Sequence, residues 1–335
     1  MHSYQPSPAQ LISFSEQEIM EKAVSANHPF RKLNQLINLD KIARSYRKLY
    51  SKTGAKGLPV EKALRALVIQ FLEDYSDRQL ERALEENLAV KWFVGFELGE
   101  ATPDHSFFGK FRDRLGSRNL EAIFNTVNSV LEEKGLIGST FHFIDASGII
   151  TKSTLWAERD QAIKAGEEKL NNQNVKRYAK DPDATYGCKG KDKFWFGHKR
   201  TVRVDMSQGL ITKVVTTTAK LTDAQVLVQH PELIPDKGLV IADKGYDTAE
   251  AQGKIKEKTD CSGIIQKNNR KTKNRDKDRF LSKLRMPFEG VFSKNSKRAR
   301  YRGLLKVHFQ VLAESIAHNL KRLIVIGESI SYQSG

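Results

Sequence analysis

The chain has 335 residues and a formal net charge of +16 at pH 7, because 56 Lys and Arg residues stand against 40 Asp and Glu residues. That length has room for about two domains of roughly 150 residues each, with an apolar core large enough to exclude a small disulfide-stapled scaffold. The positive excess favours a polyanionic partner, so nucleic acid is the leading expectation.

Membrane insertion and secretion are not expected. No apolar run approaches the roughly 18 residues that a spanning helix needs, and the N-terminal stretch lacks the basic start and apolar run of a signal peptide. The two cysteines, Cys188 and Cys261, lie far apart without the spacing of a zinc site. This pattern favours a reducing compartment, so we expect a cytoplasmic protein.

Residues 1–137 are expected to form a helical domain, because apolar residues recur at spacings of three and four. Pro59 is placed to open one helix, and Ser76 with Gln79 forms a capping box that opens the next. Two helices that meet near Tyr75 have the outline of a helix-turn-helix, a motif that can contact DNA. Such pairs are equally common in helical bundles with no DNA role, so the contact is left open.

Strand-like segments follow after residue 138. Five of them have the β-branched and aromatic content of strands, and they cover 140–145, 198–206, 209–219, 238–243 and 261–267. Their order, with a hairpin in the middle and helical stretches between the later segments, predicts an α/β fold with a mixed sheet and flanking helices. We expect this second domain to span residues 138–327.

Three features complete the expected second half. A polar insertion is predicted over about 151–195, where the composition is hydrophilic and the strand pattern is lost. A final helix over 303–326 is predicted to pack on the sheet, since its Leu, Ile and Val residues fall on one side. Residues 328–335 are expected to form a short polar tail.

Much of the positive charge is concentrated in one segment. Between Lys267 and Arg302 there are 14 basic and three acidic residues, whereas an ordinary solvated surface intersperses both signs. We interpret this segment as a track for the phosphates of a nucleic acid. The alternative is a basic loop that is disordered because of its composition alone.

Two aspartates stand at the ends of predicted strands. Asp145 closes the segment FHFID and Asp243 closes GLVIAD, so carboxylates on neighbouring strands can face one cavity. A third acid, Glu289, is isolated within the basic segment. Three carboxylates in a small volume repel one another unless a divalent cation lies between them, and Mg²⁺ suits such oxygen ligands. Two such ions about 4 Å apart could promote an in-line phosphoryl displacement.

Each of these aspartates also has a structural interpretation. Strand-terminal Asp residues often only cap a turn, and the spacing of Asp247 and Glu250 is typical of a capping box that opens a helix. Asp223 is likewise interpreted as a helix start. Tyr246 could stack on a base, although aromatic residues beside strands more often pack in the core.

Five segments in this order resemble the DDE transposases of bacterial insertion sequences, specifically insertion sequence family five. The segments are the helical stretch from YSKTGAKGLPVEKALRAL to FRDRLG, then FIDASGIITK, FGHKRTVRVD, VIADKGYD and RMPFEGVFSKNSKRARYRGLLKVHF. The resemblance implies an RNase H-like catalytic domain. It also implies that Asp145, Asp243 and Glu289 are the catalytic ligands of two Mg²⁺ ions, for which Mn²⁺ can substitute.

The family also places a Tyr, an Arg and a Lys around the Glu. Arg285 matches the Arg, whereas Ser282 and Ser296 stand where the Tyr and the Lys are expected. The full set of residues that we expect to contact DNA is Lys271, Lys273, Arg285, Lys294, Lys297, Arg298, Arg300 and Arg302.

The implied activity is cleavage at the ends of an insertion sequence, followed by attack of the freed 3′-hydroxyl on target DNA. The expected partners are therefore the terminal inverted repeats, the target DNA and a second copy of the chain, because two ends are cut in concert. The setting is the bacterial cytoplasm near the nucleoid. Two rival hypotheses are a catalytically silent DNA-binding regulator and a metal-dependent nuclease without strand transfer.

Overall fold

The computed structural model describes residues 15–50, 57–152, 155–190, 193–259, 261–292 and 296–333. The chain divides into two compact units, Met1–Arg112 and Asp113–Gly335. We describe each unit by itself. No helix in the described ranges is long and apolar enough to cross a bilayer.

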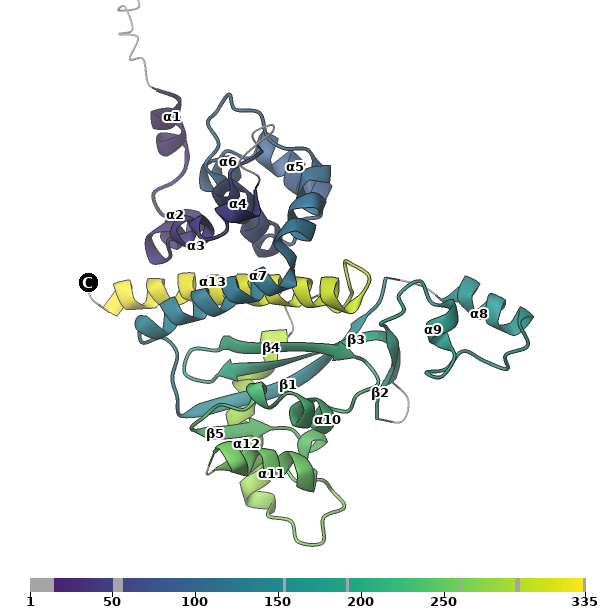
Figure 1. Ribbon diagram of the computed structural model, residues 1–335. Helices are drawn as coiled ribbons and strands as arrows, with labels where there is room; N and C mark the ends of the chain where they lie inside the picture. Colours follow the sequence, from purple (N-terminus) through teal and green to yellow (C-terminus); the bar gives the residue numbers. More distant parts are fainter. Residues whose placement is uncertain are drawn as a thin grey trace, which may run out of the picture. The chain divides into compact units, whose positions relative to one another are not determined.

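The first unit consists of short helices (Figure 1). They are α1 (Glu16–Ala23), α2 (Pro29–Leu36), α3 (Leu39–Arg44), the 3₁₀ turn η1 (Arg47–Leu49), α4 (Val60–Leu72), α5 (Asp77–Glu86), α6 (Leu88–Val94) and the start of α7 (His105–Glu133). Pro59 is the N-cap of α4, and Ser76 with Gln79 forms the expected capping box of α5. Ten of the 13 residues of α4 are buried, so this helix is the centre of the first core.

The second unit is built around one six-stranded sheet. Its strands are β1 (Phe141–Ile150), β2 (Thr185–Lys189), β3 (Lys193–Asp205), β4 (Leu210–Thr218), β5 (Leu239–Ala242) and β6 (Ser262–Ile264). β3 runs antiparallel to β1, β2 and β4, whereas β5 pairs with β1, and β6 with β5, in parallel. The expected mixed sheet is therefore confirmed.

Helices cover both faces of this sheet (Figure 1). They are α10 (Asp223–Gln229), α11 (Ala249–Lys258), α12 (Arg275–Arg285) and α13 (Leu304–Gln333), with the 3₁₀ turns η2 (Pro231–Leu233), η3 (Lys244–Tyr246) and η4 (Met286–Phe292). Consecutive residues of β3 point to opposite faces, so Lys199 reaches Asp223 of α10 whereas Arg200 reaches Glu314 of α13. The fold class is thus the expected RNase H-like α/β arrangement, preceded by a helical region.

The division between the units falls inside α7, not at residues 137 and 138 as expected. Gly116 has a φ of 68° and interrupts the helix. Beyond it, Asn128 donates to the carbonyl of Thr212 and accepts from Asn319. This second half of α7 therefore packs on the sheet and on α13, although it has the same helical sequence pattern as the first unit.

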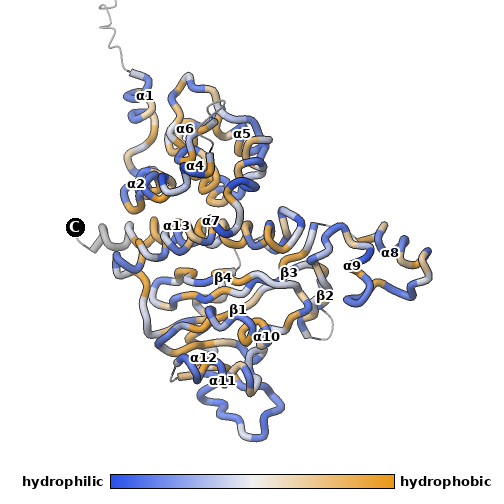
Figure 2. Tube along the Cα trace, in the orientation of Figure 1, coloured by the Kyte–Doolittle hydropathy of each residue, from blue (hydrophilic) through white to orange (hydrophobic). Residues whose placement is uncertain are grey.

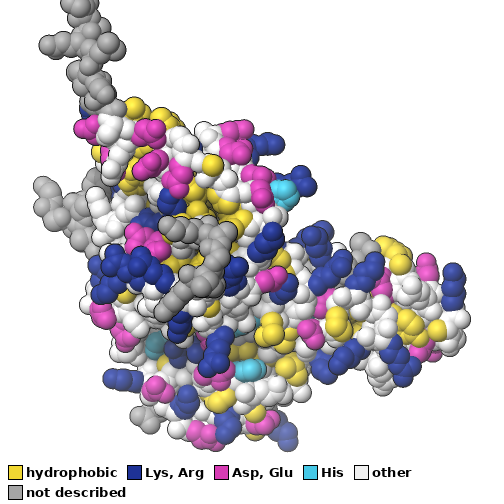
Figure 3. Space-filling view, turned by 45° about the horizontal axis from the view of Figure 1, so that its top comes forward, with side chains coloured by type: hydrophobic (Ala, Val, Ile, Leu, Met, Phe, Trp, Pro, Cys, Tyr) yellow, Lys and Arg dark blue, Asp and Glu magenta, His cyan; other side chains and the backbone are white. Residues whose placement is uncertain are grey.

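The expected insertion contains α8 (Trp156–Lys164), α9 (Val175–Tyr178) and β2. Trp156 of α8 and Phe194, near the start of β3, are each 68% exposed. Hydrophobic side chains are visible in Figure 3 on the part of the second unit that contains α8 and α9. The expected polar tail is only partly correct. The helix α13 continues past Gly327 to Gln333, because a single glycine costs a helix only about 1 kcal/mol. Residues 334 and 335 lie outside the described ranges.

Candidate active site

Asp145 and Asp243 emerge side by side from the sheet. Ile144 of β1 pairs in parallel with Ala242 of β5, so the next residue on each strand is one of the two aspartates. Both side chains are partly buried. The two predicted carboxylates are therefore held at the same level of adjacent strands by the backbone ladder itself.

Backbone amides fix both carboxylates locally. Asp145 Oδ1 accepts a hydrogen bond from the amide of Ala146 at 2.9 Å. Asp243 caps η3, and its Oδ1 accepts from the amide of Gly245 at 2.7 Å. Only Asp243 caps a turn, because Asp145 lies inside β1 and bonds to the amide of the next strand residue. Each aspartate still presents a further carboxylate oxygen, so the capping role of Asp243 and the metal-binding interpretation are compatible.

The electrostatics of Asp145 fit a bound cation. Burial raises the pKa of Asp145 to about 6 from its ordinary value of 3.8, and the negative charge of Asp243 adds to the rise. The positive charges of Arg285 and Lys189 act in the opposite direction. A divalent cation would relieve this cost, and hard carboxylate oxygens are the ligands that Mg²⁺ prefers.

Glu289 lies in η4, directly after α12. Pro287 belongs to the same turn, and its missing amide and fixed φ end the α-helix at Arg285. The side chain of Glu289 lies outside the described part of the structure. Among the side chains that are described, no group of three Asp, Glu, His or Cys residues is placed to hold a metal ion. Asp145 and Asp243 are brought together, and the third ligand stays a prediction.

A further carboxylate that the sequence interpretation assigned only to a helix start borders the same place. Asp223 is the first residue of α10, and Lys199 Nζ binds its Oδ1 at 2.6 Å. A Cβ atom added to Gly245 would lie 2.8 Å from Asp243 Oδ1 and 3.1 Å from Asp223 Oδ2. The two carboxylates therefore enclose Gly245, a contact between distant segments that no local motif signals.

Tyr246 lies beneath these carboxylates and is fully buried. Within the described residues its hydroxyl has no hydrogen-bond partner. Burial raises the pKa of Tyr246 well above its ordinary range, and the charges of Asp223, Asp145 and Asp243 add to this. The hydroxyl therefore stays protonated. A buried ring cannot stack on a base, so the core interpretation of this tyrosine is correct.

Asp247 does not cap the following helix. Thr248 is the N-cap of α11, whereas the buried Asp247 accepts two hydrogen bonds from Arg270 and one from the amide of Lys267. The hydrogen bonds from Arg270 contribute most to a pKa of about 2 for Asp247. This ion pair attaches the hydrophilic loop between β6 and α12, which is blue in Figure 2, to the turn that follows Asp243.

The predicted DNA-contacting residues fall into two groups. Arg285 lies beside the aspartates, with its guanidinium 5.7 Å from the ring centre of Phe143. In the loop, Lys271 is exposed, whereas Lys273 is engaged with Asp278 at 3.5 Å. This loop follows the carboxyl end of β6, the edge of the sheet at which Asp243 also lies.

The second group follows η4. The segment that contains Lys297 and Arg298 pairs with the end of β1, since the amide of Ile150 donates to the carbonyl of Lys297 and Ile150 forms a parallel bridge with Arg298. Arg302 is exposed and Arg300 is partly buried. Lys294 lies outside the described residues.

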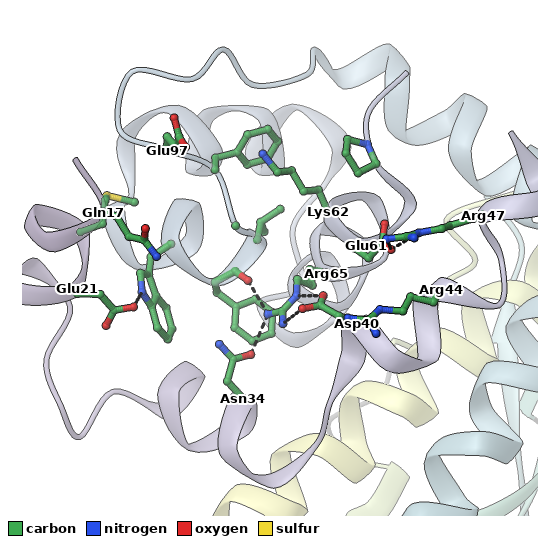
Figure 4. Close-up of a pocket in the computed structure, with 17 residues that line it drawn as sticks. Gln17, Glu21, Asn34, Asp40, Arg44, Arg47, Glu61, Lys62, Arg65 and Glu97 are labelled. Atoms are coloured by element: carbon green, nitrogen blue, oxygen red, sulfur yellow. Dashed lines mark hydrogen bonds and ion pairs between the residues drawn. The ribbon is translucent and has the colours of Figure 1, made fainter. Parts of the chain in front are cut away.

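A cleft of about 770 Å³ lies within the first unit (Figure 4). Charges of both signs line it: Arg65 binds Asp40 at 2.7 and 3.0 Å, and Arg47 binds Glu61 at 2.6 Å. The cleft contains none of the predicted site residues. Because its charges are paired, it has no excess of positive charge that would attract phosphate.

The expected helix pair α4 and α5 is present, with Ser76 in its turn. Its second helix carries more acidic than basic residues, which are Asp77, Glu81, Glu85, Glu86, Arg78 and Arg82. This charge does not favour phosphate contact along α5, and the role of the pair in DNA binding stays open.

Comparisons with known proteins agree with this geometry. The family described as "Transposase DDE domain" matches residues 140–320, and "Transposase domain (DUF772)" matches residues 18–114. The chain is 31% identical over 227 residues to a transposase for insertion sequence element IS1106 from Neisseria meningitidis serogroup B, covering 64% of this chain and 76% of that relative.

Among solved structures, the chain is similar to a piggyBac transposase in a synaptic complex with hairpin DNA. The likeness has a TM-score of 0.43 at 10% identity and covers 92% of this chain and 77% of that one. The family match alone extends over more than half of the sequence and includes both aligned aspartates. The chain therefore belongs to the DDE transposase family, whose members cleave DNA and transfer its strands.

Proposed function

We propose that Asp145, Asp243 and Glu289 form the catalytic metal site with which this transposase cleaves the ends of an insertion sequence of family five and joins the 3′-hydroxyl ends to target DNA. The family uses divalent metal ions, and we assign two Mg²⁺ ions here, with Mn²⁺ as a substitute. The observation that carries the proposal is the pairing of β1 with β5, which sets Asp145 and Asp243 side by side.

When bound, the metal ions would polarise the phosphodiester and activate the attacking oxygen. The residues of the chain do the remaining work. Backbone amides hold Asp145 and Asp243 in place, and Lys199 pairs with the neighbouring Asp223 and so compensates its charge. Arg285 supplies a positive charge beside Asp145, where it can bind a phosphate oxygen in two-point contact.

We assign DNA contact to the basic residues Lys271, Lys273, Arg285, Lys294, Lys297, Arg298, Arg300 and Arg302. Support comes from the ion pair between Asp247 and Arg270, which holds the basic loop next to the turn that follows Asp243. Support also comes from the pairing of the Lys297 segment with β1. The helical region is assigned to the terminal repeats. Because two ends are cut in concert, we propose a homodimer on DNA in the bacterial cytoplasm, near the nucleoid.

The metal site is tested with DNA that carries the element ends, incubated with Mg²⁺. Asp145→Asn, Asp243→Asn and Glu289→Gln should each abolish cleavage while DNA binding is largely retained, because each removes a ligand without changing the side-chain volume. Asp160→Asn, on an exposed part of α8, is the matched control and should cleave normally. Cleavage by all three site variants would remove the proposal.

Strand transfer is tested separately with DNA ends that already carry a free 3′-hydroxyl. The transposase should join these precut ends to a target plasmid, and the same three variants should not. Cleavage of intact ends without any joining of precut ends would instead favour the metal-dependent nuclease.

The DNA track is tested by the salt dependence of binding. Each phosphate that a basic residue neutralises contributes about −0.9 to the slope of log K against log salt. A double variant of Lys297→Ser and Arg298→Ser should therefore make the slope shallower by about two units. Lys164→Ser with Lys169→Ser, two exposed lysines of the insertion, is the control. An unchanged slope in the first pair would exclude these contacts.

A further inference from the structure

A buried ion pair links the sheet to α13 beside the proposed site. Arg200 of β3 is 1% exposed, and its Nη1 donates to Glu314 Oε2 of α13 at 2.7 Å. The same guanidinium donates from Nε to Ser147 Oγ at 2.8 Å and from Nη2 to the carbonyl of Ser296 at 3.1 Å. One side chain thus joins β3, β1, α13 and the segment that follows η4.

Gln310 extends this network along the same segment. Its Nε2 donates to Glu314 Oε1 at 2.7 Å and to the carbonyl of Arg298 at 3.1 Å. Its Oε1 accepts from the amide of Arg300 at 2.7 Å. Residues 296–300 are therefore held by side chains on one side and by backbone pairing with Ile150 on the other.

The position of Arg200 relates two of the proposed metal ligands. Ser147 lies two residues after Asp145 on β1, and Ser296 lies seven residues after Glu289. The guanidinium therefore bridges the strand that carries Asp145 and the described segment that begins at Ser296. The planar guanidinium has donors on three nitrogens in fixed directions and so reaches three separate acceptors, whereas all three donors of a lysine are on a single nitrogen.

The burial of this pair needs an explanation beyond stability. Removing two charges from water is costly, and apolar residues of similar volume often stabilise a fold equally well or better. The pair contributes orientation, because the hydrogen bonds from Arg200 to Ser147 and Ser296 specify one arrangement of β1 relative to the segment after η4.

We propose that Arg200, supported by Glu314, is a positioning residue that sets the distance between the Asp145 strand and the segment carrying Glu289, Lys297 and Arg298. This inference rests on the assignment of Asp145 and Glu289 to the metal site. Arg200 itself touches neither DNA nor metal in this role.

The test is a paired replacement, Arg200→Met with Glu314→Leu, which leaves no unpaired buried charge. We expect this double variant to fold and to melt near the wild-type temperature. The amide of Ala299, which donates to the carbonyl of Ile150, should exchange its hydrogen at least about 10-fold faster, because the segment loses its anchor. Cleavage should fall by about 100-fold, with a higher Mg²⁺ requirement, because the ligands are misplaced.

Two further variants sharpen this test. Arg200→Lys keeps the positive charge next to Glu314 but loses the planar set of guanidinium donors. The amide hydrogen of Ala299 should therefore exchange faster in this variant as well. The control is a second ion pair of α13, between Lys306 and Asp113 at 2.8 Å, in which both side chains are exposed. Lys306→Gln with Asp113→Asn should leave exchange at Ala299 and the Mg²⁺ requirement unchanged.

Wild-type exchange at Ala299 together with wild-type cleavage in the Arg200 and Glu314 double variant would overturn the positioning role. A lower melting temperature with an unchanged Mg²⁺ requirement would also overturn it, because it would reduce the pair to a structural contact. The exchange measurement needs no metal, so it is independent of the metal-site assignment. That assignment fails on its own measurement, which is cleavage by Asp145→Asn.

Discussion

Replacing Asp145 by Asn should make the metal-free protein more stable while it abolishes cleavage. A rise in the pKa of Asp145 from 3.8 in the unfolded chain to about 6 in the folded chain corresponds to at most about 3 kcal/mol. Below pH 4 the carboxyl group of residue 145 is protonated in both the folded and the unfolded chain, so it costs the folded state no stability. As the pH rises from 4 to 6, the unfolded chain releases its proton first, so the folded state loses stability and carries the full cost above pH 6.

Urea unfolding in EDTA, followed by tryptophan fluorescence, measures this difference. At pH 8 the Asp145→Asn variant should exceed the wild type by up to about 3 kcal/mol, and at pH 5 the gap should shrink to about half of that. Asp160→Asn, an exposed site, should match the wild type at both pH values. Equal stability of Asp145→Asn and the wild type at pH 8 would show that the carboxylate is not held at an unfavourable position.

Three other predictions concern the surroundings of the site. Arg270→Gln should lower the free energy of unfolding at pH 7, because it removes the ion pair with Asp247. This loss should vanish as the pH falls from 4 to 2, where Asp247, with its lowered pKa of about 2, takes up a proton and loses the ion pair in the wild type as well. Gly245→Ala should cut cleavage by about 100-fold with DNA binding retained, because the new methyl group displaces the carboxylates of Asp243 or Asp223; normal cleavage would contradict this. Tyr246→Phe should raise metal-free stability by about 1 kcal/mol in thermal unfolding, since it removes a buried hydroxyl without a partner among the described residues; a large loss of stability would mean that the hydroxyl is bonded.

Local signals predicted the parts of the fold that local chemistry decides. The capping box of Ser76 and Gln79 is confirmed. The hairpin between β3 and β4 is confirmed, with Gly209 at a φ of 69° in its turn. Asp145 and Asp243 could be identified because each follows a run of apolar residues, and the parallel pairing of their strands brings them together. The expectation that Asp145 ends its strand was wrong, because β1 continues to Ile150 through its pairing with β3.

Contacts between residues far apart in the chain could not be predicted from local sequence patterns. Arg200 and Glu314 are 114 positions apart, and nothing near either residue indicates a partner. Lys199 and Asp223 meet only because the sheet and α10 pack together. The same reason explains the boundary inside α7, whose second half belongs to the sheet unit through Asn128. β2 was missed because the segment TYGCK lacks apolar alternation.

Because β1 pairs with β5 at the proposed site, a change of length in these strands should be tolerated less well than a change of length in the insertion. Adding or deleting one residue within β1 before Asp145 would turn that carboxylate to the opposite side of the sheet, so natural variants should keep the lengths of β1 and β5 constant. The stretch from Thr151 to Ala184 lies outside the core ladder and is attached to it through Asp181, which pairs with His198 of β3, and Asn172, which bonds to Tyr186 of β2. The exposed turn after α8 carries neither of these contacts. Related elements can therefore be expected to differ in size there, and a reporter tag inserted between α8 and α9 should leave cleavage intact.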